Sequence, residues 1–252
     1  MLKTKYTVDE QPLPTKNIIT MCNQPHTPKS FASLQPNGFD AVVVAGGDFP
    51  THAVPLTLVE QARMLVACDS AGEELIRRGY MPTAIIGDCD SMLQEFLTAH
   101  RDIIYKVEEQ DYNDLTKATR FCVERGCRRI AYVGATGKRE DHTLGNISLL
   151  DFYRREMHIA ALMATDHGVF LSASGTTELA TFAGQQVSIF NLTCSHLEGD
   201  GLRWQPYAFA AMWQGTLNET TGESITLRGD GSYMVYGVYC LLYTSPSPRD
   251  TR

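Results

Sequence analysis

The sequence lacks any apolar segment long enough to cross a bilayer. Fully apolar runs such as residues 41–45 (AVVVA) are far shorter than the roughly 20 residues that a membrane-spanning helix needs. The first ten residues, MLKTKYTVDE, contain no apolar core of signal-peptide length. We therefore expect a cytoplasmic protein with no membrane partner.

Paired cysteine motifs are also missing. The seven cysteines are an odd number and include no CxxC pair. This pattern predicts neither a disulfide framework nor a cysteine-based zinc site, and it suits the reducing cytoplasm.

Positive charge is scarce as well. The 22 Lys and Arg residues against 29 Asp and Glu residues give a formal net charge of −7. An acidic chain is a poor candidate for binding nucleic acid, so we expect no nucleic-acid partner. A phosphate compound would have to be held by local Lys and Arg side chains or through a metal ion.

Short β-branched runs alternate with helical patterns between residues 41 and 157. Ser70, with Glu73 as a capping box, is predicted to start one helix, and Asn113 or Asp114 and then about Thr143 start the next two. Strands are predicted at residues 41–45, 64–68, 84–86, 103–107 and 130–133. The alternation predicts an α/β fold with a mostly parallel sheet and helices on both faces.

The pattern changes after about residue 166. Short alternating segments such as GVFLSAS, TELATFA, ESITLRG and YMVYGVY are separated by turn residues. They predict a smaller all-β domain, built as a sandwich or barrel. We expect an α/β domain at 39–165 and an all-β domain at 166–239, preceded by a proline-containing N-terminal extension at 1–38.

The last residues, 240–252 (CLLYTSPSPRDTR), have a separate interpretation. CLLYTSPSPRD matches the in-frame translation of a common sequencing-library adapter, which indicates a non-native tail after Tyr239. The alternative is a native disordered tail, which the Ser and Pro content favours.

Carboxylates gather where predicted strands end. Asp88 and Asp90 lie two residues apart in GDCDS, so an extended backbone would point both the same way, and Asp69 ends another strand. Three carboxylates at one sheet edge favour a hard cation, Mg²⁺, over zinc. The alternative is that these residues cap helices and form turns. Cys89 is expected to pack inward.

Two further stretches could bind a nucleotide. DYNDLTKA (111–118) places polar groups at a helix start, which could also be simple capping. GATGKREDH (134–142) joins a strand to a helix, with glycines for close approach and with Lys138 and Arg139 as cations. Its spacing does not fit a P-loop. The alternative is that this glycine-rich stretch is a connecting turn that binds no ligand. The DxDx[TV] phosphatase pattern fits poorly because Ser91 and Met92 follow Asp90.

Taken in order, these motifs resemble those of the thiamine pyrophosphokinase family. The resemblance covers roughly residues 40–239. It rests on ACDSAG (67–72), GDCDS (87–91), DYNDLTKA (111–118), GATGKREDHTLGNISLL (134–150), GLRW (201–204) and GTLNE (215–219).

The resemblance implies transfer of a diphosphate from ATP to thiamine, with release of AMP, by a homodimer whose sites lie between subunits. It assigns Mg²⁺ binding to Asp69, Asp88 and Asp90, and thiamine contact to Trp204 and Asn218. It assigns catalysis to Asp88, Asp90, Asp114, Arg139 and Asp141. It assigns ATP binding to Asp111, Asn113, Lys117, Gly134, Gly137, Arg139, His142 and Asn146. The α/β domain would then bind ATP, and the all-β domain would bind thiamine.

Elementary electrostatics agrees with this assignment. A magnesium ion between Asp88 and Asp90 would invert the local negative charge and bridge to phosphate. Thiamine is a cationic aromatic, so the face of Trp204 could stack on it, although Trp204 could instead be a core residue of the β domain.

The sequence departs from the family pattern at two positions, and two other functions remain as alternatives. Cys89 stands where the family usually has an aromatic residue, and Leu217 stands where Ser often precedes the Asn. The other functions are a related pyrophosphokinase acting on another heteroaromatic alcohol, such as a pterin, and a thiamine or nucleotide sensor without turnover.

Overall fold

The structure is a computed structural model that describes residues 38–90 and 92–239. The predicted tail at 240–252 and the predicted extension, apart from residue 38, lie outside the described residues. Among the described residues, no helix is long and apolar enough to cross a membrane.

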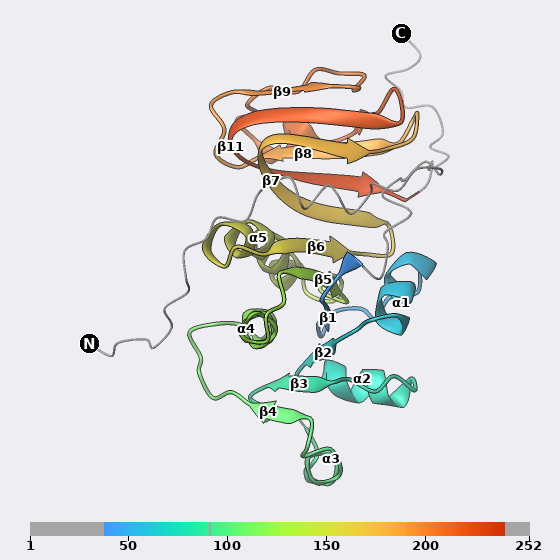
Figure 1. The fold of residues 1–252 in the computed structure, drawn as a ribbon, viewed down its shortest axis with the longest axis vertical. Coiled ribbons are helices and arrows are strands. Elements are labelled where there is room, and N and C mark those ends of the chain that lie inside the picture. The colour runs from blue at the N-terminus through green and yellow to red at the C-terminus, as the bar shows by residue number, and fades with distance from the viewer. Residues whose placement is uncertain (1–37, 91, 240–252) are drawn as a thin grey trace, which may run out of the picture.

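Six strands form the parallel part of the sheet, in the order β4-β3-β2-β1-β5-β6 (Figure 1). In the central strands Val43 pairs with Val66 on one side and with Tyr132 on the other. The strands are β1 (Ala41–Val44), β2 (Leu65–Cys68), β3 (Ala84–Gly87), β4 (Ile104–Lys106), β5 (Arg129–Val133) and β6 (Ala160–Ala164). The predicted α/β architecture is confirmed, and β6 is a strand that the sequence analysis missed.

Helices cover both faces of these strands, because successive strand residues point to opposite sides. Val43 and Val66 belong to one core with Leu115 and Leu150, whereas Val42 packs in a second core on the other face. Figure 1 shows α1 and α2 on one side of the sheet and α4 on the other. The helices are α1 (Ala53–Glu60), α2 (Ala71–Arg77), α3 (Gln94–Ala99), α4 (Asp114–Glu124) and α5 (Glu140–Glu156).

Helix ends follow the sequence signals only in part. Asn113 caps α4, because its Oδ1 accepts a hydrogen bond from the Thr116 amide at 3.0 Å. The prediction of a capping box at Ser70 is wrong, because Ser70 already has helical backbone angles and its side chain makes no cap hydrogen bond. α5 begins at Glu140, earlier than predicted, and α1 and α3 were not predicted.

The chain after residue 166 continues the same sheet instead of starting a separate one. β7 pairs with β6 in antiparallel orientation, with Leu171 beside Leu162. The elements are β7 (Gly168–Ala180), β8 (Gln186–Asn191), β9 (Leu197–Asp200), the 3₁₀ helix η4 (Met212–Gly215), β10 (Asn218–Glu219) and β11 (Ser224–Val238). This β half still has a core of its own, which includes Ile189, Leu227 and Tyr233.

Two long strands replace four predicted short ones in the β half. GVFLSAS and the first four residues of TELATFA belong to β7, and all but the first residue of ESITLRG and the last residue of YMVYGVY belong to β11. The pairing register of β11 with β7 shifts between Gly229 and Ser232. On its other edge β11 pairs with β9 before this shift and with β8 after it. The shift therefore lets the two ends of one strand belong to two different layers of the β half.

Candidate active site

The loops that follow β1 and β5 meet at the carboxyl edge of the sheet. Strands β2, β3 and β4 are added to the sheet on one side of β1, whereas β5 and β6 are added on the other side. The order of the strands therefore reverses between β1 and β5, and α/β sheets bind ligands at such a switch point. The Gly47 amide donates to the Gly134 carbonyl at 2.7 Å. A Cβ atom at position 47 would lie 2.3 Å from the Thr136 oxygen, so only glycine fits.

A cavity of about 620 Å³ opens on the α4 and α5 side of this crevice. Most of the predicted metal-binding and nucleotide-binding residues line it together. They are Asp69, Asp88, Asp111, Asn113, Asp114, Lys117, Gly137, Arg139, His142 and Asn146.

The aspartates reach the cavity from neighbouring strand ends. The Asp69 amide donates to the Ile86 carbonyl at 2.9 Å, which holds the ends of β2 and β3 together. A side chain at position 87 would come within 2.9 Å of the Asp69 Cβ, so Gly87 permits this approach. With Asp88 following β3, the wall of the cavity carries concentrated negative charge.

Asp90 does not line this cavity. Cys89 has φ 60, so the extended backbone expected between Asp88 and Asp90 is wrong, and only Asp88 of the two lines the cavity. The Asp90 Oδ1 lies 3.3 Å from the Lys106 Nζ, while its amide donates to Asp88 Oδ1 at 3.2 Å. Cys89 itself is buried, as predicted. Within residues 38–90 and 92–239, no three Asp, Glu, His or Cys side chains form a metal-binding group.

Two cations at the cavity are paired with carboxylates. Lys117 is buried on α4, with its Nζ 3.2 Å from Asp114 Oδ1. Arg139 lies 2.5 Å from Asp141 Oδ2, and hydrogen bonds from Arg139 lower the pKa of Asp141 to about 2. Asp141 does not line the cavity but fixes a residue that does.

Amide side chains connect the walls. Asn113 Nδ2 lies 3.4 Å from Asn146 Oδ1, and Asn146 Nδ2 donates to the Ala135 carbonyl at 2.8 Å. Gly134, with φ 61, does not line the cavity, but its carbonyl accepts the hydrogen bond from the Gly47 amide. These contacts join α4, α5 and the loop after β5 into one frame.

Trp204 and Asn218 lie in the β half, and neither lines the cavity. Asn218 is buried and donates to the Trp204 carbonyl at 2.7 Å, while the Trp204 amide donates back to Asn218 Oδ1 at 3.2 Å. The Trp204 side chain is 52% exposed, so the core-tryptophan alternative is wrong. Other exposed apolar side chains of this half are Tyr207, Met212, Trp213 and Leu217.

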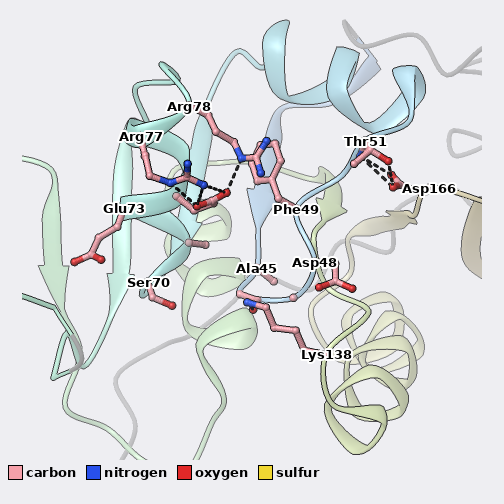
Figure 2. A pocket seen from close by; sticks show the side chains of 14 residues that line it. Ala45, Asp48, Phe49, Thr51, Ser70, Glu73, Arg77, Arg78, Lys138 and Asp166 are labelled. Atoms are coloured by element: carbon pink, nitrogen blue, oxygen red, sulfur yellow. Dashed lines mark hydrogen bonds and ion pairs between the residues drawn. The ribbon is translucent and has the colours of Figure 1, made fainter.

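A second cavity of about 710 Å³ lies on the α2 side of the loop after β1 (Figure 2). It shares five lining residues with the first cavity, which are Ala45, Gly46, Gly47, Ser70 and Lys138. Arg78 lies over the Phe49 ring, 4.2 Å from its centroid. Sequence reasoning missed this cavity, and the available signal was the Gly-Gly pair directly after a buried strand.

Ion pairs and hydrogen bonds frame the second cavity. Glu74 binds both Arg77, at 2.5 Å, and Arg78, at 2.6 Å. On the opposite side, Figure 2 shows Asp166 accepting hydrogen bonds from Thr51. Burial alone would raise the pKa of Asp166, but the hydrogen bonds outweigh it and lower the pKa. The turn between β6 and β7 is thereby attached to the start of α1.

Two family models match this chain in succession. Residues 56–161 match the thiamin pyrophosphokinase catalytic domain, and residues 168–236 match the thiamin pyrophosphokinase substrate-binding domain. The chain belongs to the thiamine pyrophosphokinase family. The resemblance seen in the sequence is confirmed, and the gap between the two matches, residues 162–167, covers the end of β6 and the turn before β7.

Individual relatives agree with this family. The chain is 30% identical to thiamine pyrophosphokinase 1 of Oryza sativa subsp. japonica over 156 residues, which are 52% of this chain and 58% of that protein. It is 32% identical to thiamine pyrophosphokinase of Bacillus subtilis (strain 168) over 118 residues, which are 43% of this chain and 52% of that protein. The chain thus spans somewhat more than half the length of these curated relatives.

Solved structures share the fold. A thiamine pyrophosphokinase from Bacillus subtilis superposes with a TM-score of 0.66 at 19% identity, over 79% of this chain and 98% of that one. One from Geobacillus thermodenitrificans gives 0.65 at 23% identity, over 79% of this chain and 96% of that one. A thiamin pyrophosphokinase from Candida albicans superposes with a TM-score of 0.66 at 15% identity, over 79% of this chain and 89% of that one.

Proposed function

We propose that the chain transfers a diphosphate group from ATP to the hydroxyethyl group of thiamine, forming thiamine diphosphate and AMP. The observation that carries this proposal is the acidic cavity at the switch point of the sheet, in a chain of the thiamine pyrophosphokinase family. ATP is a polyanion, so the carboxylates at this cavity require a cation if ATP is to bind there.

The donor set supports Mg²⁺ as that cation. Asp69 and Asp88 offer carboxylate oxygens, and Mg²⁺ commonly takes one or two carboxylates and fills its remaining positions with phosphate oxygens and water. A three-carboxylate cage is therefore unnecessary, and we propose Asp69 and Asp88 as the ligands. When bound, the ion would neutralise phosphate charge and offset the charge that develops on the leaving AMP.

The chain's own residues would position the reacting groups. Lys117 and Arg139 offer cationic N–H groups to phosphate oxygens, and Asp114 and Asp141 hold these cations in place. The Asp90 amide orients the Asp88 carboxylate. Phosphoryl transfer depends mainly on such positioning and charge, which supports these residues as the catalytic set.

The same frame would bind the nucleotide. The remaining candidates are Asp111, Asn113, Gly134, Gly137, His142 and Asn146. Apart from Gly134, whose carbonyl accepts the hydrogen bond from the Gly47 amide, all of them line the first cavity.

We also propose that two copies complete each site. The first cavity is lined by residues between Ala45 and Asn146, so one chain does not supply Trp204 to it. Asn218 fixes the backbone of Trp204 and leaves the indole exposed for a cationic ring, a contact worth roughly 0.5–2 kcal/mol. The thiamine-binding half, residues 166–239, would then close over the nucleotide-binding half, residues 39–165, of a second copy.

The proposed reaction is tested by phosphorus NMR of the products formed from ATP, thiamine and Mg²⁺. We expect thiamine diphosphate and AMP in equal amounts. Thiamine monophosphate with ADP would contradict the proposal. Tight thiamine binding without turnover would favour a sensor, and turnover only with a pterin alcohol would favour the related pyrophosphokinase.

A further inference from the structure

Lys138 lies on the wall that separates the two cavities. It is the residue after Gly137 in the loop that follows β5, and it lines both hollows. Its Nζ donates a hydrogen bond to the Gly46 carbonyl at 2.7 Å. Figure 2 shows the side chain extending towards the loop after β1, near Ala45.

The backbone at this position is costly for a lysine. Lys138 has φ 57, directly after Gly137 with φ 80, so two successive residues are left-handed. Glycine adopts this conformation without penalty, whereas a residue with a Cβ atom pays for it. A strained residue beside a binding cavity supports a functional role for its side chain.

The other lysine and arginine side chains that face the cavities are occupied by carboxylates. Lys117 pairs with Asp114, Arg139 pairs with Asp141, and Glu74 takes both Arg77 and Arg78. Among the described residues, Lys138 forms no ion pair with a carboxylate, and its bonded partner is a neutral carbonyl. An ammonium group has three N–H donors, so two remain for a ligand.

We propose that Lys138 binds a phosphate group of the nucleotide's polyphosphate chain at the boundary between the two cavities. The Gly46 carbonyl would hold the ammonium in place, and its two remaining donors would bind phosphate oxygens. The polyphosphate would then extend from the aspartates of the first cavity towards the second cavity. This inference rests on the proposed function for the identity of the donor as ATP.

Titration calorimetry with magnesium tripolyphosphate, and separately with adenosine, tests the inference without requiring turnover. Lys138→Met removes the charge and keeps the strain, whereas Lys138→Gly removes both. We expect both variants to bind tripolyphosphate about 10-fold more weakly, because a hydrogen-bonded charge is lost, and to bind adenosine unchanged. Arg101→Met, which removes an exposed positive charge after α3, should bind tripolyphosphate like the wild type.

Steady-state kinetics separate phosphate binding from a purely structural tether. We expect the KM for ATP to rise in both Lys138 variants, with the KM for thiamine unchanged, and Lys138→Arg to recover part of the loss. Normal tripolyphosphate binding by Lys138→Gly together with weak binding by Lys138→Met would overturn the inference, because the charge would then be unnecessary and the loss in Lys138→Met would come from its uncharged side chain in the loop. Normal binding by both would also overturn it.

The same data distinguish this inference from the proposed function. Lys138-dependent tripolyphosphate binding in a protein that forms no thiamine diphosphate would leave the inference standing and remove the function. Thiamine diphosphate formation with tripolyphosphate binding independent of Lys138 would do the reverse. Melting temperatures of all variants check that each one is folded.

Discussion

The two halves of the molecule present their candidate residues in opposite ways. In the α/β half the polar residues converge on a hollow, and two of the cations there are already paired with carboxylates. In the β half Trp204 and Trp213 stand on the surface, 52% and 74% exposed. A phosphate chain needs donors converging from several sides, whereas a flat ring can be held on an open face once a second surface covers it. This difference is the one that the proposed site, with phosphate held by the α/β half and a ring held by the β half, would require.

The halves are nevertheless connected by a polar network. Arg154 on α5 donates to Asp151 at 2.8 Å, to Ser172 on β7 at 3.0 Å and to Ser232 on β11 at 2.6 Å. Asp151 is buried and also accepts from Arg155. The two surfaces therefore have a fixed orientation within one chain.

The largest expected effect is in the α/β half. Asp88→Asn keeps the shape of the side chain and removes its charge at the cavity. We expect turnover to fall about 1,000-fold, which corresponds to about 4 kcal/mol of transition-state stabilisation. Steady-state AMP release measures this loss, and circular dichroism controls for folding. Near-normal turnover in saturating Mg²⁺ would exclude Asp88 from the site.

The connection between the halves should dominate stability. Burial would raise the pKa of Asp151, but hydrogen bonds from Arg154 and Ser172 outweigh it, so the pKa lies below its ordinary value of 3.8. Asp151 therefore stabilises the fold at pH values above about 4, and this stabilisation is lost as pH falls through the lowered pKa.

We expect Asp151→Asn to reduce the free energy of unfolding by about 3 kcal/mol at pH 7, because it leaves Arg154 without its ion-pair partner. The difference from the wild type should shrink below about pH 4. Urea unfolding across this range measures both quantities. A difference that does not depend on pH would mean that packing, and not charge, carries the effect.

A smaller and more selective effect is expected in the β half. Trp204→Ala should weaken thiamine binding about 10-fold and leave ATP binding unchanged, because only thiamine carries a cationic ring. Since the side chain is half exposed, stability should change by less than about 0.5 kcal/mol. Calorimetry with each substrate measures the selectivity, and equal loss for both substrates would contradict the assigned role.

Much of the first cavity could be predicted, because it depends on where strands end. Asp69 and Asp88 follow neighbouring parallel strands, and parallel strands deliver their carboxyl ends to one edge. Asn113 was predicted for a related reason, since a polar residue before an apolar helical face is a cap.

The remainder depends on geometry that residue type does not encode. Asp90 was misplaced because Cys89 adopts a left-handed conformation, which is rare for a residue other than glycine. The second cavity was missed because its walls, such as Phe49 and Arg78, come from loops and helices that meet only in the folded chain. The sequence did not predict that the β half continues the same sheet, because the β6–β7 pairing depends on tertiary contact and not on local pattern.

Subunit complementation tests most directly whether the two halves form one site across two copies. Asp88→Asn and Trp204→Ala proteins are mixed, exchanged under mild denaturant and assayed for AMP release at low thiamine. A site shared between subunits gives mixed dimers with one intact site of two, so activity should rise to about a quarter of the wild type. Activity that stays at the average of the two separate variants would contradict the account.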